Sequence, residues 1–268
     1  MKMTNTTYNI KGINTKILLI SDIHYISKKD IKLLNEVLDN IKKQKPKFIC
    51  IPGDLTECSN IKDEEVLLNF LLKLSKISKV IISLGNHEFY YNKTKKEFKL
   101  NNNLIDKIKS IDNVYFLDNE NAIIDNINFI GLTLPITHFM FNKESYIDFK
   151  NNTKTIKTNK KFYNVLLCHS PVNVLNKEFI NSNSLDLILC GHMHGGLVPS
   201  FLRKVFKTNG LVNPQKQLFP KNIYGYKKIN NTNIIITSGI KVISNKKIFN
   251  KLNILFKPEV ACINIKSK

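Results

Sequence analysis

Residues 16–24 are KILLISDIH, an apolar run that ends in Asp22 and His24. Two later stretches repeat this layout, KFICIPGD at 47–54 and KVIISLGNHE at 79–88. Short apolar runs that stop at Gly, Asp or Asn are typical of buried β-strands followed by turns. The polar residues therefore lie just past strand ends, which is where the sheets of α/β proteins carry their functional sites.

Apolar runs recur along the whole chain and alternate with amphipathic segments, which is the pattern of strands separated by helices. We predict strands at residues 16–21, 47–52, 79–84, 113–117, 127–134, 162–168, 185–190, 233–238 and 259–265. Helices are predicted at 29–43, 63–77, 95–110 and 172–181, where leucine and isoleucine return at helical spacing. The fold class is layered α/β.

The length and the loops set the domain organisation. A chain of 268 residues fits a single layered domain, so we expect one domain over residues 1–268. Residues 197–231 carry three prolines and are predicted to be mostly loop. Long loops in compact domains are often functional.

Five predicted strands end in side chains that bind metals well. The candidate ligands are Asp22, His24, Asp54, Asn86, His169, His192 and His194. Five of the six histidines of the chain fall in these motifs or directly beside them, which favours a metal site over unrelated structural histidines. Imidazole together with carboxylate suits Mn, Fe or Zn and does not exclude Mg.

The local spacing of the ligands is consistent with shared ions. Asp22 and His24 are two residues apart, as are His192 and His194. In an extended backbone such residues point the same way, so each pair is expected to reach one ion. Glycine precedes Asp54, Asn86 and His192, which permits tight turns and close backbone approach.

The charge of such a centre fits an anionic phosphate. Two divalent ions would outweigh Asp22, Asp54 and a bridging hydroxide, leaving a net positive site. Ions about 3.5–4 Å apart would lower the pKa of a bridging water and bind the attacking and phosphoryl oxygens. His87, next to Asn86, is the candidate general acid, and both residues are candidate substrate contacts. We therefore predict a binuclear metal-dependent phosphoesterase that uses a metal-bridging hydroxide.

The motifs DxH, GD, GNHE, a lone histidine after a strand and GHxH occur in this order over residues 22–194. This series resembles the calcineurin-like metallophosphoesterase family. The resemblance implies a four-layer sandwich of two mixed β-sheets flanked by helices. It also implies one ion held by Asp22, His24, Asp54 and His194, and a second held by Asp54, Asn86, His169 and His192. Asp54 would bridge the ions, and His87 matches the active-site histidine that contacts the substrate phosphate.

Within the family the chain is most similar to a bacterial subgroup with the motif GHTHGGQ. The chain has GHMHGGL at 191–197, then Pro199, Gly225-Tyr226, Ser238-Gly239 and Pro258-Glu259. The subgroup includes membrane-associated phosphoesterases, some of which act on UDP-diacylglucosamine. Leu197 stands where the subgroup has glutamine, and the N-terminal membrane segment common there is not found. The substrate therefore stays open between nucleotide-linked, lipid and simpler phosphate mono- or diesters.

The net charge of +20 would suit a nucleic acid or an anionic membrane. However, the cations are almost all lysine, and Arg203 is the only arginine. Proteins that read phosphates and bases usually exploit the bidentate guanidinium group. A compositional drift towards lysine, asparagine and isoleucine explains the charge better. A nuclease and a catalytically weak metal-binding scaffold remain the alternatives to the proposed enzyme.

Cysteine usage and hydropathy indicate the compartment. Five cysteines without regular spacing, Cys50, Cys58, Cys168, Cys190 and Cys262, favour neither a disulfide framework nor a zinc ribbon. No stretch approaches the roughly 18 apolar residues of a membrane span, and the N-terminus lacks an apolar signal region. We expect a cytoplasmic protein, with peripheral contact to the inner face of an anionic membrane left open. The oligomeric state is not defined.

Four features have two interpretations each. Glu57 either orients His87 or starts a helix. His138 is expected to be an exposed loop histidine, with substrate contact as the alternative. Cys168 and Cys190 are expected to be small buried hydrophobic residues outside the site. LVPSFLRKVF at 197–206 is either a membrane-contacting lip or a loop packed on the core.

Overall fold

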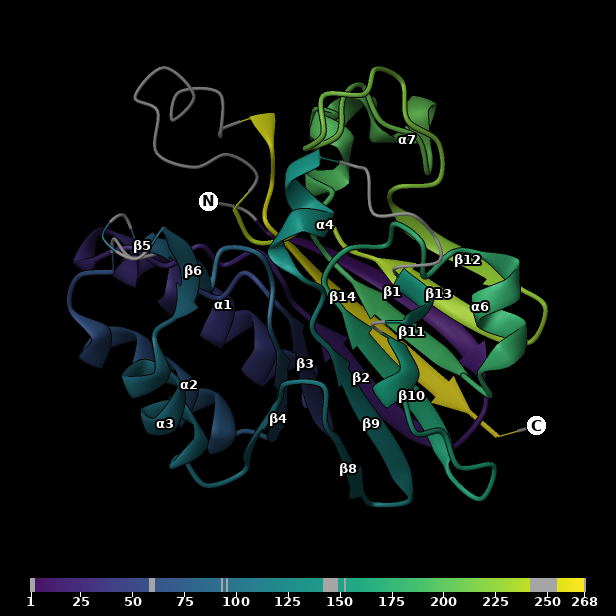
Figure 1. Ribbon diagram of the computed structural model, residues 1–268, viewed down its shortest axis with the longest axis horizontal. Helices are drawn as coiled ribbons and strands as arrows, with labels where there is room; N and C mark the ends of the chain where they lie inside the picture. Colours follow the sequence, from purple (N-terminus) through teal and green to yellow (C-terminus); the bar gives the residue numbers. More distant parts are fainter. Residues whose placement is uncertain are drawn as a thin grey trace.

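The computed structural model describes residues 3–57, 61–92, 94, 96–141, 149–151, 153–241 and 255–267. Cys58 lies outside them. Two six-stranded sheets form the centre of the molecule (Figure 1). The first contains β1 (Thr4–Lys11), β14 (Glu259–Lys266), β2 (Thr15–Leu19), β3 (Phe48–Pro52), β4 (Lys79–Ser83) and β7 (Val114–Leu117), in that spatial order. The second contains β12 (Gly225–Ile229), β13 (Thr232–Ile236), β11 (Leu187–Cys190), β10 (Tyr163–Cys168), β9 (Ile127–Leu132) and β8 (Asn121–Ile124).

Both sheets are mixed. In the first sheet β2, β3, β4 and β7 run parallel, whereas β14 pairs antiparallel with β2 and parallel with β1. In the second sheet β9, β10, β11 and β13 run parallel between antiparallel edge strands β8 and β12. The ends of the parallel strands therefore carry their following loops to the same side of each sheet.

The apolar runs form central strands because both of their faces are covered. In β2, Ile17 and Leu19 face the other sheet, and the alternate Leu18 lies in the core beneath the helices. The inter-sheet core includes Phe48 and Phe129, whose ring centroids are 5.0 Å apart. Parallel strands buried on both faces read as continuous apolar sequence.

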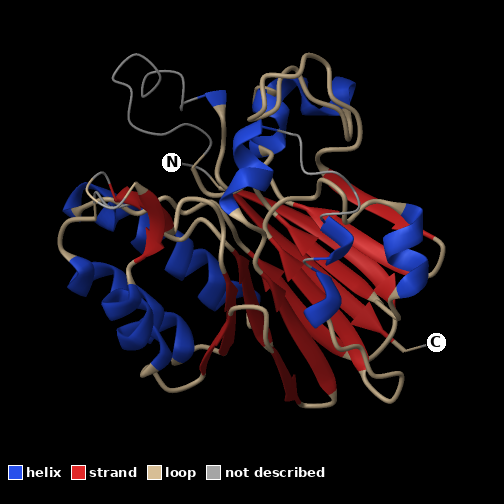
Figure 2. Cartoon of the chain, viewed as in Figure 1, coloured by secondary structure: helices blue, strands red, loops and turns tan. Residues whose placement is uncertain are grey.

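Helices cover the outer face of each sheet (Figure 2). α1 (Ile31–Gln44), α2 (Glu64–Ser75) and α3 (Asn102–Lys109) pack on the first sheet, and α6 (Lys177–Ser182) packs on the second. The short helices α4 (Ile136–Phe141) and α7 (Arg203–Phe206) lie beyond the strand ends. This arrangement of helix, sheet, sheet and helix confirms the four-layer fold class.

All nine predicted strands are present, with ends that differ by a few residues. The sequence did not indicate β1, β8 and β12, which are edge strands with partly exposed faces and less continuous apolar sequence. Nor did it indicate the hairpin of β5 (Phe89–Asn92) and β6 (Glu97–Leu100).

The predicted helix at 95–110 is wrong in its first half. Residues 97–100 form β6, and the helix begins at Asn102 because the Asn101 side chain accepts a hydrogen bond from the Leu104 amide. The predicted helix at 172–181 likewise begins later, at Lys177, after the capping residue Asn176. Among the described residues, no helix combines the length and the apolar character that crossing a membrane requires.

Candidate metal centre

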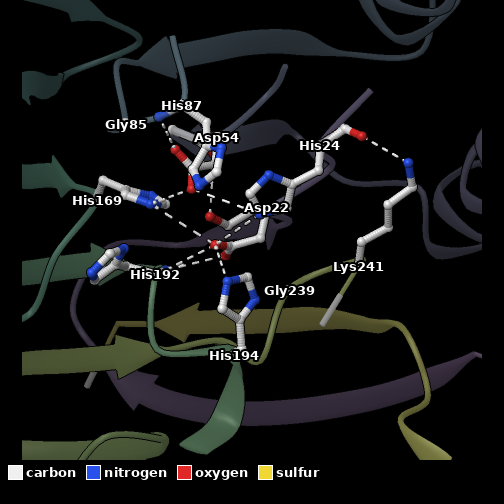
Figure 3. A network of polar contacts seen from close by, with 12 residues as sticks. Asp22, His24, Asp54, Gly85, His87, His169, His192, His194, Gly239 and Lys241 are labelled. Carbon is white, nitrogen blue, oxygen red and sulfur yellow. Dashed lines mark hydrogen bonds and ion pairs between the residues drawn. The ribbon is translucent and has the colours of Figure 1, made fainter. Parts of the chain in front are cut away.

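The loops after five strands of the two sheets converge on one site (Figure 3). The candidate residues are Asp22 and His24 after β2, Asp54 after β3, Asn86 and His87 after β4, His169 after β10, and His192 and His194 after β11. In Figure 3 the imidazoles of His24, His169, His192 and His194 surround the carboxylates of Asp22 and Asp54. The site draws on both sheets and lies where their strand ends meet.

Three groups of ligand atoms in the described part of the chain have the spacing that a bound ion requires, one of them made of His24, Glu57 and His87. The other two consist of predicted ligands alone. Asp22, His24 and His194 form one cluster, and Asp54, His169 and His192 form the other. Within each cluster the ligand atoms all lie within 4.8 Å of one another. Ligand atoms that bind one ion at about 2.0–2.2 Å lie at similarly short distances from one another.

Asp54 lies between the two clusters. Its Oδ2 atom is 2.9 Å from Nε2 of His169 in one cluster and 3.7 Å from Nε2 of His24 in the other. Asp22 is also central, with Oδ1 3.9 Å from Nε2 of His169 and of His194. A carboxylate in the position of Asp54 is able to contact an ion on either side.

The backbone at these ligands is not extended, contrary to the reasoning from spacing. Asp22, His24 and Asp54 have φ angles of 53°, 46° and 51°, and His192 and His194 have 67° and 44°. This left-handed conformation costs a non-glycine residue about 1–3 kcal/mol, and such residues concentrate at functional sites. Asp22 and His24 do converge in one cluster, because the chain turns sharply after β2. His192 and His194 lie in different clusters, which differs from the expectation that both reach one ion.

Close backbone packing holds these turns, as the glycines predicted. A Cβ atom on Gly191 would collide with Ser21 and with the carboxylate of Asp22, and one on Gly85 would collide with Asp54. The His192 amide donates to both carboxylate oxygens of Asp22, at 3.1 and 3.2 Å. The Asp22 carboxylate therefore depends on the glycine turn after β11 as well as on its own strand.

The hydrogen bonds of two histidines fix which ring nitrogen faces the site. Nδ1 of His169 lies 2.7 Å from the carbonyl oxygen of Pro52, so Nδ1 carries the proton and donates. Nδ1 of His24 faces the Glu57 carboxylate at 2.8 Å, so the proton is expected on this nitrogen too. With the proton on Nδ1, each ring is able to present the lone pair of Nε2 to the cluster, as metal-binding histidines commonly do.

Glu57 orients His87 instead of starting a helix. Its Oε1 atom lies 3.4 Å from Nδ1 of His87, while Oε2 is occupied by His24. The next helix, α2, begins only at Glu64. The His87 amide also donates to Oδ1 of Asp54 at 2.9 Å, which ties the ring to the centre.

Buried acceptors without donors indicate a cation at this position. Among the described residues, Asp54 Oδ2, Asn86 Oδ1 and His169 Nε2 are buried and have no hydrogen-bond partner. Asp54 Oδ2 and His169 Nε2 nevertheless face each other at 2.9 Å. Two lone pairs at that distance repel unless a proton or a metal ion lies with them. The carboxylate, amide and imidazole atoms present thus fit divalent ions.

The pKa values show how the charges in the site interact. Burial opposes ionisation of Asp54, but the imidazoles of His169 and His87 hold its pKa well below the usual range. Burial lowers the pKa of His169, whereas Asp54 and Asp22 raise it, with a net value of about 9. Burial, reinforced by the charge of His169, lowers the pKa of His192. His192 is therefore neutral at neutral pH and has a lone pair to offer an ion.

Three residues with contacts at the site were not singled out from the sequence. The Gln215 side-chain amide lies 2.9 Å from Nε2 of His192. Lys241 donates to the carbonyl oxygen of His24 and pairs with Asp30, both at 2.7 Å. The Glu88 carboxylate accepts from the amides of Asp54, Thr56 and Gly85. Only Glu88 lies in a recognisable motif, the GNHE stretch.

His138 is not the exposed loop histidine that we expected. It lies in α4 with 3% of its surface exposed and its ring contacts Phe139 and Phe149. Its position became buried because the segment forms a helix over the strand ends. Cys168 and Cys190 are fully buried in the core beneath α6, as expected.

Comparison with known proteins identifies the family. The model of calcineurin-like phosphoesterases matches residues 15–196. An uncharacterized metallophosphoesterase of Campylobacter jejuni is 27% identical over 201 residues, covering 74% of this chain and 48% of that protein. One from Helicobacter pylori is 26% identical over 224 residues, covering 79% and 54%. The chain spans about half the length of these curated relatives.

Among solved structures, a dimetal phosphatase from Danio rerio aligns with a TM-score of 0.46 and 13% identity, covering 88% of this chain and 90% of that one. The family match covers more than half of the chain and includes every predicted site residue from Asp22 to His194. The chain belongs to the calcineurin-like phosphoesterase family.

Proposed function

We propose that the chain hydrolyses phosphate mono- or diesters with two divalent metal ions held by the two clusters. The observation that carries this proposal is the buried pair of Asp54 Oδ2 and His169 Nε2, which lie 2.9 Å apart without hydrogen-bond geometry. One ion would contact Asp22, His24, Asp54 and His194, and the other Asp54, Asn86, His169 and His192. Mn, Fe and Zn suit this mixture of nitrogen and oxygen ligands.

The chain's own residues supply positioning and proton transfer. When bound, the ions would polarise the phosphoryl oxygens and make a water molecule nucleophilic near neutral pH. His87 is partly exposed, with 27% of its side chain accessible, so it is able to reach a substrate. Glu57 holds Nδ1 of His87 and leaves Nε2 to donate a proton to the departing alcohol. Asn86 and His87 are the proposed substrate contacts.

The direct test removes ligands one at a time. Asp54→Asn and His192→Ala should abolish hydrolysis of an aryl phosphate ester in the presence of Mn, while circular dichroism shows an intact fold. Asp112→Asn, an exposed aspartate in the loop before β7, makes the same change away from the site and should retain full activity. Activity retained by Asp54→Asn would refute the proposed centre.

A metal-by-substrate matrix separates the enzyme from its alternatives. Aryl monoester, aryl diester, cyclic nucleotide, single-stranded DNA and a nucleotide-linked lipid would each be tested with Mn, Fe, Zn and Mg. Cleavage of DNA, with an affinity that falls steeply with salt, would identify a nuclease. Tight metal binding without turnover on any substrate would identify a scaffold. Preference for the nucleotide-linked lipid would place the chain with the GHTHGGQ subgroup.

We propose that the segment 197–224 makes a peripheral contact with the cytoplasmic face of a membrane. It exposes Phe201, Val205, Leu218 and Phe219 by 68–74% of their surface. The same 28 residues carry five cations and no acid. Exposed apolar side chains among lysines suit the boundary of an anionic bilayer, where the cations meet the headgroups.

Co-sedimentation with vesicles of anionic and neutral phospholipid tests this contact. Phe201→Asp combined with Phe219→Asp should abolish binding to anionic vesicles. Tyr91→Asp, which replaces an aromatic residue of similar exposure on β5, should bind as the wild type does. Equal binding by the double variant and the wild type would exclude a membrane-contacting lip.

A further inference from the structure

A small cavity borders the candidate metal centre on the side of His194. Its volume is about 60 Å³. The lining includes His194, Ser200, Arg203, Tyr224, Ser238 and Lys257. None of these residues except His194 belongs to the metal clusters. The cavity has room for about two water molecules, or for a small oxyanion of similar size.

Arg203, the only arginine of the chain, lines this cavity and has an unsatisfied donor. Its Nη2 atom donates to the carbonyl oxygen of Val198 at 3.2 Å, and its guanidinium carbon lies 4.2 Å from the Tyr224 ring centroid. In the described part of the chain, Nη1 is buried and has no hydrogen-bond partner. A buried charged donor without a partner is costly, so an acceptor is expected there.

The turn after β11 is shaped to admit this side chain. A Cβ atom on Gly195, the residue after His194, would collide with the Arg203 guanidinium. Gly195 has a φ of 56°, a conformation that glycine adopts without strain. The guanidinium therefore lies directly against the backbone that carries His194.

The carboxylate in the lining forms no direct ion pair with Arg203. Glu259 also lines the cavity, but its two oxygens accept five hydrogen bonds, from Thr6, Tyr224, Thr237 and, twice, Ser238. In the described part of the chain, Glu259 and Arg203 form no ion pair, for which a distance of 4.0 Å or less between nitrogen and oxygen is required. Lys257, held at the rim by the bond from its amide to Ser200, adds a second cation. The lining charges therefore sum to about +1 when His194 is neutral.

We propose that the cavity lined by Arg203 is an anion subsite that binds a phosphate group beside the metal centre. The bidentate guanidinium and the Ser200 hydroxyl match the oxygens of a phosphate. The group is either a second phosphate of the ester substrate or free inorganic phosphate. The first source rests on the proposed function, whereas binding of free phosphate does not.

The binding arm uses chelator-treated protein and inorganic phosphate, followed by calorimetry. Arg203→Gln should weaken phosphate binding about tenfold, because a charge-assisted hydrogen bond is lost. Lys204→Gln makes the same change of charge one residue along, outside the lining, and should leave binding unchanged. Equal phosphate affinity in these two variants would overturn binding of free phosphate at this cavity.

The kinetic arm uses the metal-loaded protein and a matched pair of aryl phosphates, one with a second phosphate on the ring. Arg203→Gln should raise KM about tenfold for the bisphosphate and affect KM for the simple ester much less. Equal effects on both substrates, together with unchanged phosphate affinity, would overturn the subsite. If no ester is hydrolysed but phosphate binding still depends on Arg203, the subsite stands and the proposed function fails.

A second pair of variants guards against a folding defect, because Arg203 also holds the loop through Val198. Lys257→Gln and Ser200→Ala alter the lining without removing the stack on Tyr224, and each should weaken phosphate binding about twofold to threefold. Arg203→Lys keeps the charge but loses the fork and should give an intermediate affinity. Wild-type affinity in all three would leave Arg203 a purely structural residue and overturn the proposal.

Discussion

Glu57 contacts two imidazoles at once, which makes it a sensitive position in the site. One carboxylate oxygen accepts from His24 and the other faces His87. Burial opposes ionisation, yet these two hydrogen bonds hold the pKa of Glu57 well below its usual range. Glu57 therefore remains a double acceptor and couples a candidate metal ligand to the candidate acid.

Glu57→Gln should impair the site although its shape is conserved. Glutamine has one acceptor oxygen, so one of the two imidazoles would face an N–H group and lose its orientation. We expect kcat, metal affinity or both to fall about 10- to 100-fold. Steady-state kinetics and metal titration with a chelating indicator measure this. Glu97→Gln, an exposed glutamate in β6, is the control, and equal behaviour of the two variants would contradict the orienting role.

Gln215 is predicted to orient His192. Its side-chain amide lies 2.9 Å from Nε2 of the ring, and with the amide oxygen turned towards this nitrogen it would accept the Nε2 proton and leave Nδ1 for an ion. Gln215→Ala should weaken metal binding about tenfold or more, because the partner that fixes the ring is lost. Lys216→Ala, next in the loop and exposed, should leave the affinity unchanged. The affinity is measured by indicator competition in the absence of substrate, and no difference between the variants would exclude the role.

The strands position the candidate ligands through the turns that follow them. The turn after β11 approaches the loop after β2 so closely that Gly191 has no room for a side chain. Strand β11 is central in its sheet, between β10 and β13, so its end cannot shift without disturbing its neighbours. The candidate metal centre thus depends on the register of two sheets.

Gly191→Ala should displace Asp22 and lose metal binding, with destabilisation of about 1–3 kcal/mol from overpacking. Gly225→Ala is the matched control, because its Cβ atom would have 3.8 Å of space to Thr208 and Tyr8. The control suffers strain at φ 80° but does not touch the site. Denaturant unfolding and metal titration are the measurements. Normal metal affinity in Gly191→Ala would show that the turn does not position Asp22.

Leu189 in β11 is fully buried in the core between the two sheets, where its packing holds β11 in place. Leu189→Ala should lower the free energy of unfolding by about 2–5 kcal/mol, since it leaves a cavity in the core. Leu72→Ala on α2, where 41% of the side chain is exposed, should cost far less. Similar losses in the two variants, measured by urea denaturation, would argue against a packed inter-sheet core.

At the scale of the whole molecule, the first and last parts of the chain share one sheet. β14 inserts between β1 and β2, and the C-terminal strand thereby completes the sheet that carries Asp22, Asp54 and Asn86. Residues 197–267, outside the family match, also contribute Gln215, Lys241 and Arg203 to the site and its border. We propose that the chain unfolds as one cooperative unit.

Calorimetry with and without Mn tests this unit. Because bound ions stabilise the folded state by mass action, metal at about 100 times its dissociation constant should add about 2.7 kcal/mol. The Tm should rise by several degrees in a single transition, and Asp54→Asn should lose most of the rise. Two separate transitions would contradict the single unit, and an equal rise in Asp54→Asn would place the metal elsewhere.

The sheet topology separates the strands that the sequence predicts from those that it does not. Eight central strands and the largely buried edge strand β7 were predictable because burial on both faces leaves a continuous apolar run, a local property of each segment. The candidate ligands were predictable because each follows such a run. The edge strands β1, β8 and β12 were not, since their partly exposed sequences carry weaker patterns.

The sequence by itself determined the identity of the candidate ligands and the layered α/β class, because strand ends and hydrophobic periodicity are local features. The tertiary structure alone decided the left-handed backbone at Asp22 and His192, the double contact of Glu57, and the approach of Gln215 and Arg203 to the centre. These features arise from contacts between segments far apart in the chain. No local pattern encodes such contacts, since they depend on how the two sheets pack.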